Sequence, residues 1–381
     1  MKKRKILYIS GTRADYGLMK SVLREIEQNP KLNLEIIVTG MHLMKEFGIT
    51  LREIEKDGFK IHKINVIYEE DNKESMANFI GKFIQLLTKK IKKIKPDIIL
   101  LLGDRGEMLA GAIVGAYLTI PVAHLHGGEI TSTVDEFSRH AITKLAHIHF
   151  PATKKSAERI IKMGEEPWRV HVVGAPGLDT ILNSKLLSRD EIGKKFPIKS
   201  KEPFILLIQH PVTTEIEEAG KQMEETMKAI KELKINTIVI YPNSDAGGRK
   251  IIKVIKKYSN EKFIHSYKSI NHLDYLSLMK HAAVMVGNSS SGIIEAPSFK
   301  LPVVNIGIRQ EGRERANNII DVPYNKEKIK KAIKIALSKE FKVKLKKCKN
   351  PYGDGKTGKR VANILAKIKI DKKLLQKRLS Y

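Results

Sequence analysis

The sequence contains one cysteine in 381 residues and no long apolar segment. A single cysteine, Cys348, cannot form a disulfide within the chain, which argues against a secreted protein and fits a reducing cytosol. No apolar run approaches the roughly 20 residues that a membrane-spanning helix requires. The apolar run that ends at Ile9 is also too short for the hydrophobic part of a signal peptide. We therefore expect a cytoplasmic protein.

Acidic residues are scarce relative to basic ones, since 42 Asp and Glu stand against 70 Lys and Arg, a formal net charge of +28. Such a charge is typical of proteins that bind nucleic acid or a membrane surface, but a lysine-rich solvated surface also produces it. The lysines recur throughout the chain, and no zinc-finger or RRM signature accompanies them. We expect neither nucleic acid nor a membrane as a partner, and a basic nucleic-acid-binding protein is the alternative from a different class.

Short apolar runs alternate with longer amphipathic stretches along the whole chain. Examples of the apolar runs are Lys5–Ser10, Asp97–Leu102, Pro121–Leu125, Phe204–Ile208 and Ala283–Val286. This alternation predicts parallel sheets covered by helices. Two such series predict an α/β protein with two doubly wound, Rossmann-like domains, residues 1–175 and 176–350, and a C-terminal helix within 351–381 that packs on the first domain. Ligands of such sheets bind beyond the carboxyl ends of the strands.

Charged residues follow two strands of the first half. Arg13 lies in a turn of small residues that leads into a helix, where free N–H groups and a guanidinium suit an anion. A plain turn with an exposed arginine explains this pattern equally well, and the motif G-x-G-x-x-G is not matched. Asp104 and Arg105 follow the strand that ends at Leu102, although an aspartate there more often caps the next helix.

The segment after residue 123 holds the most titratable groups. His124 and His126 point to one face of a strand, Glu129 follows a glycine pair, and Asp135 and Arg139 share a helical face. These groups suit proton transfer from carbon. A metal site is the rival interpretation, but the histidines match no H-E-x-x-H or facial-triad spacing, so we expect no metal.

The second half contains a candidate phosphate site. A strand, then Gly287-Asn288-Ser289-Ser290-Ser291-Gly292, then a predicted helix, would offer N–H groups, hydroxyls and a helix dipole to an anion. Glu295, one turn into that helix, could accept hydrogen bonds from ribose hydroxyls. A serine-capped helix is the simpler alternative, and the nucleophile motif G-x-S-x-G is missed. His210 and Asn243 follow two further strands.

Taken together, these loops resemble the UDP-N-acetylglucosamine 2-epimerase family, in particular its hydrolysing branch, which serves sialic-acid and legionaminic-acid synthesis. The shared motifs run along nearly the whole chain and are Gly11-Thr12-Arg13-Ala14-Asp15-Tyr16, Gly103-Asp104-Arg105, Gly127-Gly128-Glu129, Arg139-His140-Ala141-Ile142-Thr143-Lys144, His210-Pro211, Gly287-Asn288-Ser289-Ser290 and Arg309-Gln310-x-Gly312-Arg313. The resemblance implies a glycosyltransferase-B-like fold, in which two Rossmann-type domains face a cleft that holds the ligand.

The resemblance also implies two sets of site residues. The catalytic set is Asp104, His126, Glu129, Asp135, Glu136, Arg139 and His210. The UDP-binding set is Arg13, Arg105, His210, Asn243, Ser289, Ser290, Gly292, Glu295 and Arg309. Many members have a glutamate where this chain has His126, so either His126 or Glu129 is the candidate for the proton transfer of that glutamate.

The implied reaction removes the proton at carbon 2 and expels UDP from carbon 1 through a glycal-like intermediate. Water then adds, which converts UDP-N-acetylglucosamine to N-acetylmannosamine and UDP without a cofactor. Three enzymatic alternatives share the fold: hydrolysis of a UDP-2,4-diacetamido-2,4,6-trideoxy sugar, non-hydrolysing epimerisation, and glycosyl transfer. We expect a UDP-sugar as the partner and a homodimer or homotetramer as the assembly.

Overall fold

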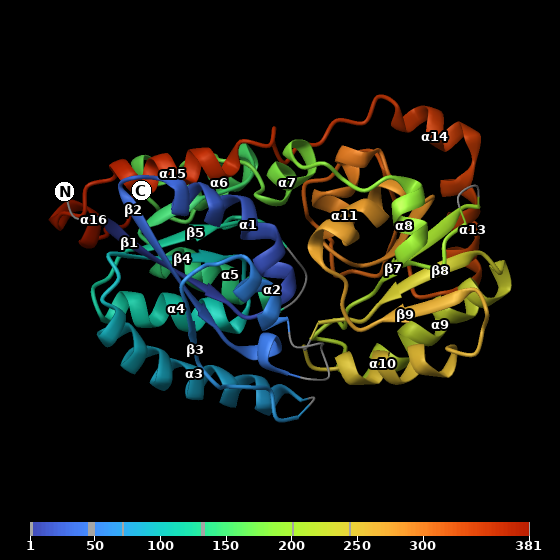
Figure 1. The fold of residues 1–381 in the computed structure, drawn as a ribbon, viewed down its shortest axis with the longest axis horizontal. Coiled ribbons are helices and arrows are strands. Elements are labelled where there is room, and N and C mark those ends of the chain that lie inside the picture. The colour runs from blue at the N-terminus through green and yellow to red at the C-terminus, as the bar shows by residue number, and fades with distance from the viewer. Residues whose placement is uncertain are drawn as a thin grey trace. The chain divides into compact units, whose positions relative to one another are not determined.

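The computed structural model contains two six-stranded parallel sheets, one in each of two compact units (Figure 1). The structure describes residues 3–44, 50–70, 72–130, 134–199, 202–243 and 245–380, without the side chains of residues 134 and 135. The first unit comprises Met1–Ile130, Val134–Asn183 and Tyr352–Tyr381, and Ser184–Pro351 belongs to the second. The predicted fold class, α/β with two Rossmann-like domains, is confirmed.

The first sheet has the strand order β3-β2-β1-β4-β5-β6, and neighbouring strands are parallel. Its strands are β1 Arg4–Ser10, β2 Leu32–Val38, β3 Ile61–Lys63, β4 Ile98–Leu102, β5 Val122–Leu125 and β6 Ile148–Phe150. The order reverses between β1 and β4, and such a switch point opens a crevice at the carboxyl ends of the strands. Loops after β1 and β4 therefore lie where ligands bind in this fold class.

Helices cover both faces of the first sheet. Its helices are α1 Arg13–Gln28, α2 Leu51–Lys56, α3 Lys73–Ile94, α4 Gly106–Tyr117, α5 Val134–Leu145, α6 Lys154–Lys162, α7 Gly177–Asn183, α15 Thr357–Lys367 and α16 Lys372–Leu375, with 3-10 turns η1 Gly40–Leu43 and η3 Pro167–Arg169. Figure 1 shows α1 and α15 on one side of the strands and α3 and α4 on the other. A capping box between Thr12 and Asp15 starts α1, and its apolar stripe then packs on the sheet.

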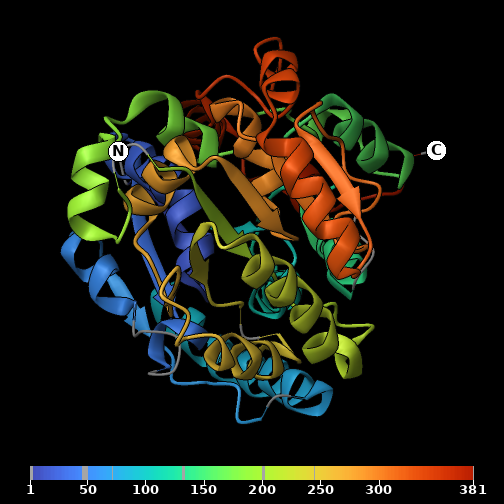
Figure 2. The same ribbon diagram turned by 90° about the vertical axis from the view of Figure 1, so that its right-hand side faces the viewer.

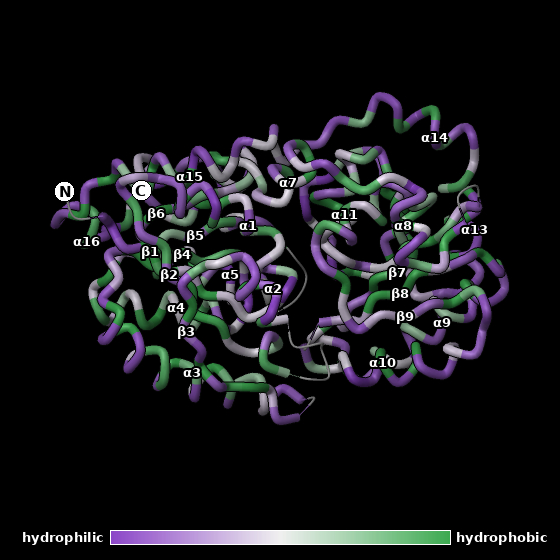
Figure 3. Tube along the Cα trace, viewed as in Figure 1, coloured by the Kyte–Doolittle hydropathy of each residue, from purple (hydrophilic) through white to green (hydrophobic). Residues whose placement is uncertain are grey.

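The second sheet repeats this topology, with the order β12-β11-β10-β7-β8-β9. Its strands are β7 Phe204–Ile208, β8 Asn236–Ile240, β9 Ile264–Tyr267, β10 Val284–Gly287, β11 Val303–Ile306 and β12 Ile319–Val322. In Figure 3, β7 and β8 are green, hence hydrophobic, for most of their length. Strands buried on both faces read as continuous apolar runs, which is why they could be predicted.

The second sheet is also covered on both sides, as Figure 2 shows. Its helices are α8 Arg189–Lys195, α9 Ala219–Leu233, α10 Gly248–Lys257, α11 His272–His281, α12 Ser291–Ile294, α13 Lys326–Leu337 and α14 Lys339–Leu345, with 3-10 turns η4 Ile216–Glu218 and η5 Ala296–Phe299. Apolar residues of α9, α10 and α13 form one core with β7, β10 and β11. No helix among the described residues is both long and apolar enough to cross a membrane.

The first unit extends to Asn183, beyond the boundary predicted at residue 175, and the chain returns to this unit at Tyr352. The carboxylate of Asp179 in α7 accepts hydrogen bonds from the backbone N–H groups of Thr357 and Gly358, at 2.9 and 2.6 Å. These bonds satisfy free donors at the start of α15. The helix α15 packs on α1 so closely that a Cβ on Gly358 would lie 3.1 Å from the carbonyl oxygen of Ser21.

Candidate active site

The guanidinium of Arg139 joins the loops that follow β4 and β5. Arg139 extends from α5, is 1% exposed, and donates from Nη1 to the carbonyl oxygen of Glu129 at 3.0 Å. Its Nη2 donates to Oδ2 of Asp104 in a short ion pair. A buried guanidinium is tolerated only when acceptors compensate its charge. The structure thus brings together Asp104, Glu129 and Arg139, which the sequence placed in one set.

His126 and Glu129 form a buried pair within the same loop. Nδ1 of His126 lies 2.6 Å from Oε1 of Glu129, so the carboxylate orients the imidazole ring and leaves Nε2 for another partner. His126 has φ +62°, a left-handed conformation that is uncommon for residues other than glycine and is often found at functional sites. The next turn needs glycine, because a Cβ on Gly128 would lie 2.2 Å from the carbonyl oxygen of Ser156.

The other histidines of this region have separate partners. Nε2 of His124 contacts the carbonyl oxygen of Gly103 at 2.7 Å, and burial lowers the pKa of His124 to about 3, which keeps it neutral. Nε2 of His140 lies 3.1 Å from Oε1 of Glu136, one turn away on α5. The side chain of Asp135 lies outside the described residues. Within the described part of the chain, no group of three His, Cys, Asp or Glu side chains is arranged to hold a metal.

A hydrogen-bonded network supports the turn that carries Arg13. The buried carboxylate of Asp15 accepts from the hydroxyl of Tyr8 at 3.0 Å and from the backbone N–H of Thr12 at 2.7 Å, and it also accepts from Ser10. Burial raises the pKa of Asp15. These bonds hold the backbone between β1 and α1 in one conformation, so the position of Arg13 is determined by the strand below it.

In the second unit, the loops after β7, β8 and β10 meet at His210. Its backbone N–H donates to Oδ1 of Asn288 at 2.6 Å, and Nδ2 of Asn288 donates back to its carbonyl oxygen at 2.9 Å. The backbone N–H of Asn243 donates to Nδ1 of His210 at 3.1 Å, which orients the ring. Gly287 has φ +120°, and a Cβ there would lie 1.9 Å from the carbonyl oxygen of Ile208.

The predicted phosphate cradle differs from expectation, because α12 is a single turn. It ends at Ile294, and the η5 turn that follows contains Pro297. Proline has no N–H to donate back into a helix and clashes with the carbonyl four residues earlier. A helix this short contributes little dipole. The hydroxyls of Ser289 and Ser290 are therefore stronger candidates for anion binding than the helix dipole is.

The remaining second-unit residues of the UDP-binding set lie around the same loop. Nη1 of Arg309 approaches the carbonyl oxygen of Asn288 at 3.4 Å, and Nε2 of Gln310 donates to that oxygen at 2.9 Å. Glu295 is 2% exposed at the end of α12. Gly292 is required for packing, because a Cβ there would lie 2.9 Å from Cγ1 of Val303.

A family model described as UDP-N-acetylglucosamine 2-epimerase matches residues 24–366. The chain belongs to this family. It is 43% identical over 379 residues to the UDP-N,N′-diacetylbacillosamine 2-epimerase (hydrolyzing) of Legionella pneumophila. This alignment covers 99% of this chain and 100% of the relative. It is 38% identical over 335 residues to the UDP-N-acetylglucosamine 2-epimerase of Neisseria meningitidis serogroup B, 88% of each chain.

Solved structures of this epimerase family share the fold. The crystal structure of UDP-GlcNAc 2-epimerase from Neisseria meningitidis bound to UDP-GlcNAc has a TM-score of 0.81 at 21% identity, over 96% of this chain and 100% of that one. The enzyme from Methanocaldococcus jannaschii in complex with UDP-GlcNAc and UDP has a TM-score of 0.78 at 23% identity, over 95% and 99%. The family model and the relatives confirm membership of the epimerase family, and the solved structures confirm the glycosyltransferase-B-like fold.

This epimerase-family chain also has buried polar residues at the strand ends that the sequence did not single out. Nε2 of His42 lies 2.9 Å from the hydroxyl of Ser10, and Nδ1 lies 2.7 Å from that of Thr50. Burial lowers the pKa of His42 to about 3. Tyr68 and Glu107 form a second buried group. These residues follow β2 and β3 or lie at the start of α4. Their position could have identified them in the sequence, because ligands bind at such strand ends.

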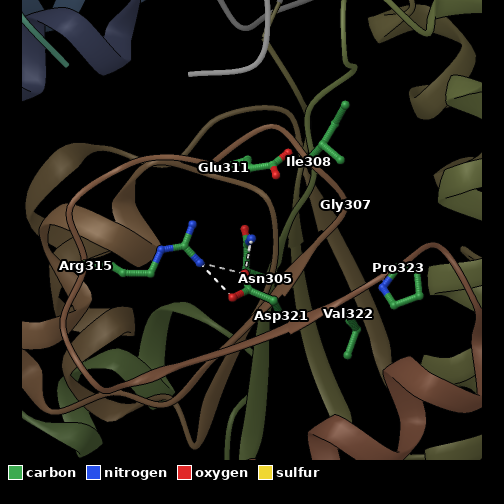
Figure 4. A pocket seen from close by; sticks show the side chains of 8 residues that line it. All are labelled: Asn305, Gly307, Ile308, Glu311, Arg315, Asp321, Val322 and Pro323. Carbon is green, nitrogen blue, oxygen red and sulfur yellow. Dashed lines mark hydrogen bonds and ion pairs between the residues drawn. The ribbon is translucent and has the colours of Figure 1, made fainter. Parts of the chain in front are cut away.

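A pocket of about 420 Å³ opens at the carboxyl ends of β11 and β12 (Figure 4). It is lined by Asn305, Gly307, Ile308, Glu311, Arg315, Asp321, Val322 and Pro323. Nη1 of Arg315 donates to both carboxylate oxygens of Asp321, at 2.8 and 2.7 Å, and Nδ2 of Asn305 donates to one of them at 2.8 Å. The charges of Arg315 and Asp321 therefore compensate each other, and the pocket holds none of the residues predicted for catalysis or UDP binding.

Proposed function

We propose that this UDP-sugar 2-epimerase is of the hydrolysing type and that it prefers UDP-N,N′-diacetylbacillosamine to UDP-N-acetylglucosamine. The Legionella pneumophila relative at 43% identity carries the first substrate and the word hydrolyzing in its name. A Campylobacter jejuni relative named GDP/UDP-N,N′-diacetylbacillosamine 2-epimerase (hydrolyzing) is 38% identical over 348 residues. The Neisseria meningitidis relative supports UDP-N-acetylglucosamine as the rival substrate.

The observation that carries the proposed chemistry is the buried pair of His126 and Glu129 beside the ion pair of Asp104 and Arg139. His126 takes the proton from carbon 2, and the electron pair of that C–H bond becomes the double bond between carbons 1 and 2. The bond from carbon 1 to the diphosphate breaks, and UDP leaves with its electrons. Water then adds its hydroxyl to carbon 1, and its remaining proton passes to the carboxylate of Asp104, which delivers it to the opposite face of carbon 2, while His126 releases its proton to solvent.

UDP is held by the second-unit residues His210, Asn243, Ser289, Ser290, Glu295 and Arg309, while Arg13 and Arg105 contact the diphosphate. Charge grows on the diphosphate as the bond to carbon 1 breaks, so fixed cations and hydroxyls stabilise the transition state more than the bound substrate. The Neisseria meningitidis and Methanocaldococcus jannaschii structures that share this fold contain UDP-GlcNAc, which supports the assignment.

Product analysis in heavy water tests the proposed reaction. The protein should convert UDP-N,N′-diacetylbacillosamine to UDP and a free sugar that carries deuterium at carbon 2, and kcat/KM should exceed that for UDP-N-acetylglucosamine by about 10- to 100-fold, the usual range for a few pocket contacts. NMR over time and parallel kinetics on both nucleotides measure this. Accumulation of an epimeric UDP-sugar would identify a non-hydrolysing enzyme. Retention of hydrogen at carbon 2 would show that no elimination occurs, and preference for UDP-N-acetylglucosamine would reverse the substrate assignment.

A further inference from the structure

Glu107, near the start of α4, is a fully buried carboxylate that lies outside both predicted site sets. Its side chain is 0% exposed, and a carboxylate in such a position is costly unless charged or polar groups pair with it. The hydroxyl of Tyr68 donates to Oε1 at 3.2 Å, and Nε of Arg105 donates to Oε2 at 3.3 Å. Nη2 of Arg105 also donates to the hydroxyl of Tyr68 at 3.3 Å. Carboxylate, phenol and guanidinium thus form a closed triangle.

The same carboxylate lies against the turns that follow β1 and β2. A Cβ on Gly11 would lie 2.4 Å from Oε1 of Glu107, and a Cβ on Gly40 would lie 3.0 Å from it. Gly40 has φ +59°, so this turn favours glycine for its backbone as well. The phenol ring of Tyr68 is held in turn by stacking on Phe79, with ring centroids 4.2 Å apart. Glu107 is therefore in contact with the ends of two strands and, through Arg105, with the loop after a third.

We infer that Glu107 is a positioning residue that fixes the guanidinium of Arg105 at the carboxyl edge of the first sheet. The inference rests on the proposed function, in which Arg105 contacts the diphosphate. An arginine whose Nε and Nη2 are already bound loses less side-chain entropy when an anion arrives. A guanidinium held in place also stabilises the leaving diphosphate without reorganisation. Glu107 acts through Arg105 and does not itself contact the substrate.

A purely structural role is the competing explanation, and Glu35 on β2 provides a matched control. Glu35 is 1% exposed, accepts from Nζ of Lys60 at 2.9 Å, and lies 2.6 Å from Nε2 of His62. Both glutamates are buried and paired with basic side chains, but Glu35 pairs with Lys5 on β1 and with residues on or just before β3, none of which is a predicted site residue. Loss of either carboxylate should lower stability, and only loss of Glu107 should affect the diphosphate site.

A double-mutant cycle tests the inference on the full-length protein. Glu107→Gln should weaken UDP binding and lower kcat/KM by about 10-fold or more, because small displacements of a positioned group are expensive. Arg105→Ala should lower both further. In the Arg105→Ala background, Glu107→Gln should have almost no additional effect on either quantity. Glu35→Gln should lower the melting temperature but leave UDP affinity and kcat/KM unchanged. Calorimetry with UDP, steady-state kinetics and thermal unfolding supply the readouts.

If Glu107→Gln lowers UDP affinity and kcat/KM equally with Arg105 present and in the Arg105→Ala background, the inference is overturned. The carboxylate would then act through the stability of the fold and not through Arg105. Unchanged UDP affinity in Arg105→Ala would overturn it as well, and the product analysis above would still decide the reaction type independently. If Glu107→Gln does not fold, Tyr68→Phe replaces it. That variant removes one side of the triangle and should lower UDP affinity in the presence of Arg105 but not in its absence; a loss in both backgrounds would again contradict the inference.

Discussion

At the scale of single residues, the sequence left two candidates for one proton-transfer role, and the structure joins them. His126 and Glu129 share a hydrogen bond of 2.6 Å, and both side chains are buried. A carboxylate that holds one ring nitrogen sets the tautomer and orientation of the imidazole, so we expect the two residues to act together. The left-handed backbone of His126 adds strain that a glycine at this position would relieve.

Substitutions in this pair should separate catalysis from binding. We expect His126→Gln and Glu129→Gln each to lower kcat by about 100-fold, the usual scale for a general base, with little change in UDP affinity. Incorporation of deuterium at carbon 2 should slow in parallel. His62→Gln is the matched control, because His62 also lies 2.6 Å from a buried glutamate, Glu35, and should keep full turnover. Normal turnover in Glu129→Gln would show that the carboxylate does not act with His126.

At the scale of elements, the C-terminal tail supports the helix that carries Arg139. Nζ of Lys377 donates to the carbonyl oxygens of Thr143, Lys144 and Ala146 at the end of α5, at 3.0, 2.7 and 2.8 Å. The last carbonyls of a helix have no partner within it, and a cation there also interacts favourably with the helix dipole. Lys377 lies 2.7 Å from the buried carboxylate of Glu165 as well.

Removal of this ammonium group should destabilise the protein in a pH-dependent way. Burial would raise the pKa of Glu165, but hydrogen bonds from His149, Lys144 and Lys377 outweigh it and lower the pKa from 4.5 to about 2. The stabilisation is therefore fully present above about pH 5 and is lost as the pH falls towards about 2. Because Lys144 and His149 remain beside Glu165, and burial lowers the pKa of Lys377 itself to about 8, we expect Lys377→Met to lower the free energy of unfolding by about 1 kcal/mol at pH 7. The difference from the unmodified protein should shrink in acid.

Urea denaturation at several pH values measures this difference. Lys372→Met is the control, since Lys372 lies in the same C-terminal segment and is exposed, and it should change stability by less than about 0.5 kcal/mol. A Lys377→Met effect of the same size at acidic and neutral pH would contradict the role of the Glu165 carboxylate.

At the scale of the whole molecule, we expect the net charge of +28 to reflect a lysine-rich solvated surface and not a nucleic-acid partner. Many lysines form exposed ion pairs, such as Lys82 with Glu69 and Lys326 with Glu232, and each pair contributes little to stability. The excess positive charge instead creates a field that attracts anions, including a nucleotide-sugar.

Binding to duplex DNA tests this explanation. We expect weak binding without sequence preference. The logarithm of the binding constant should fall linearly with the logarithm of the salt concentration, because neutralised phosphates release counterions. Fluorescence anisotropy on two unrelated duplexes over a salt series measures it. Nanomolar binding of only one duplex at physiological salt would support the nucleic-acid-binding alternative instead.

The sequence by itself determined the fold class and the family, and it predicts the loops that carry the site. It could do so because buried parallel strands are continuous apolar runs and the residues after them, such as Asp104 and His210, occupy the ligand-binding edge of any sheet of this kind. The helix expected after Gly292 is only one turn long in the structure, and Pro297 helps to end it.

Only the tertiary structure decided which distant groups meet. The spacing of residues in the sequence does not predict that Arg139 pairs with Asp104, that the carboxylate of Glu107 lies against Gly11, or that the ammonium group of Lys377 binds the end of α5. The physical reason is that each contact joins segments far apart in sequence, and it exists because packing of the helices on the sheet removes these polar groups from water and requires each to find a partner.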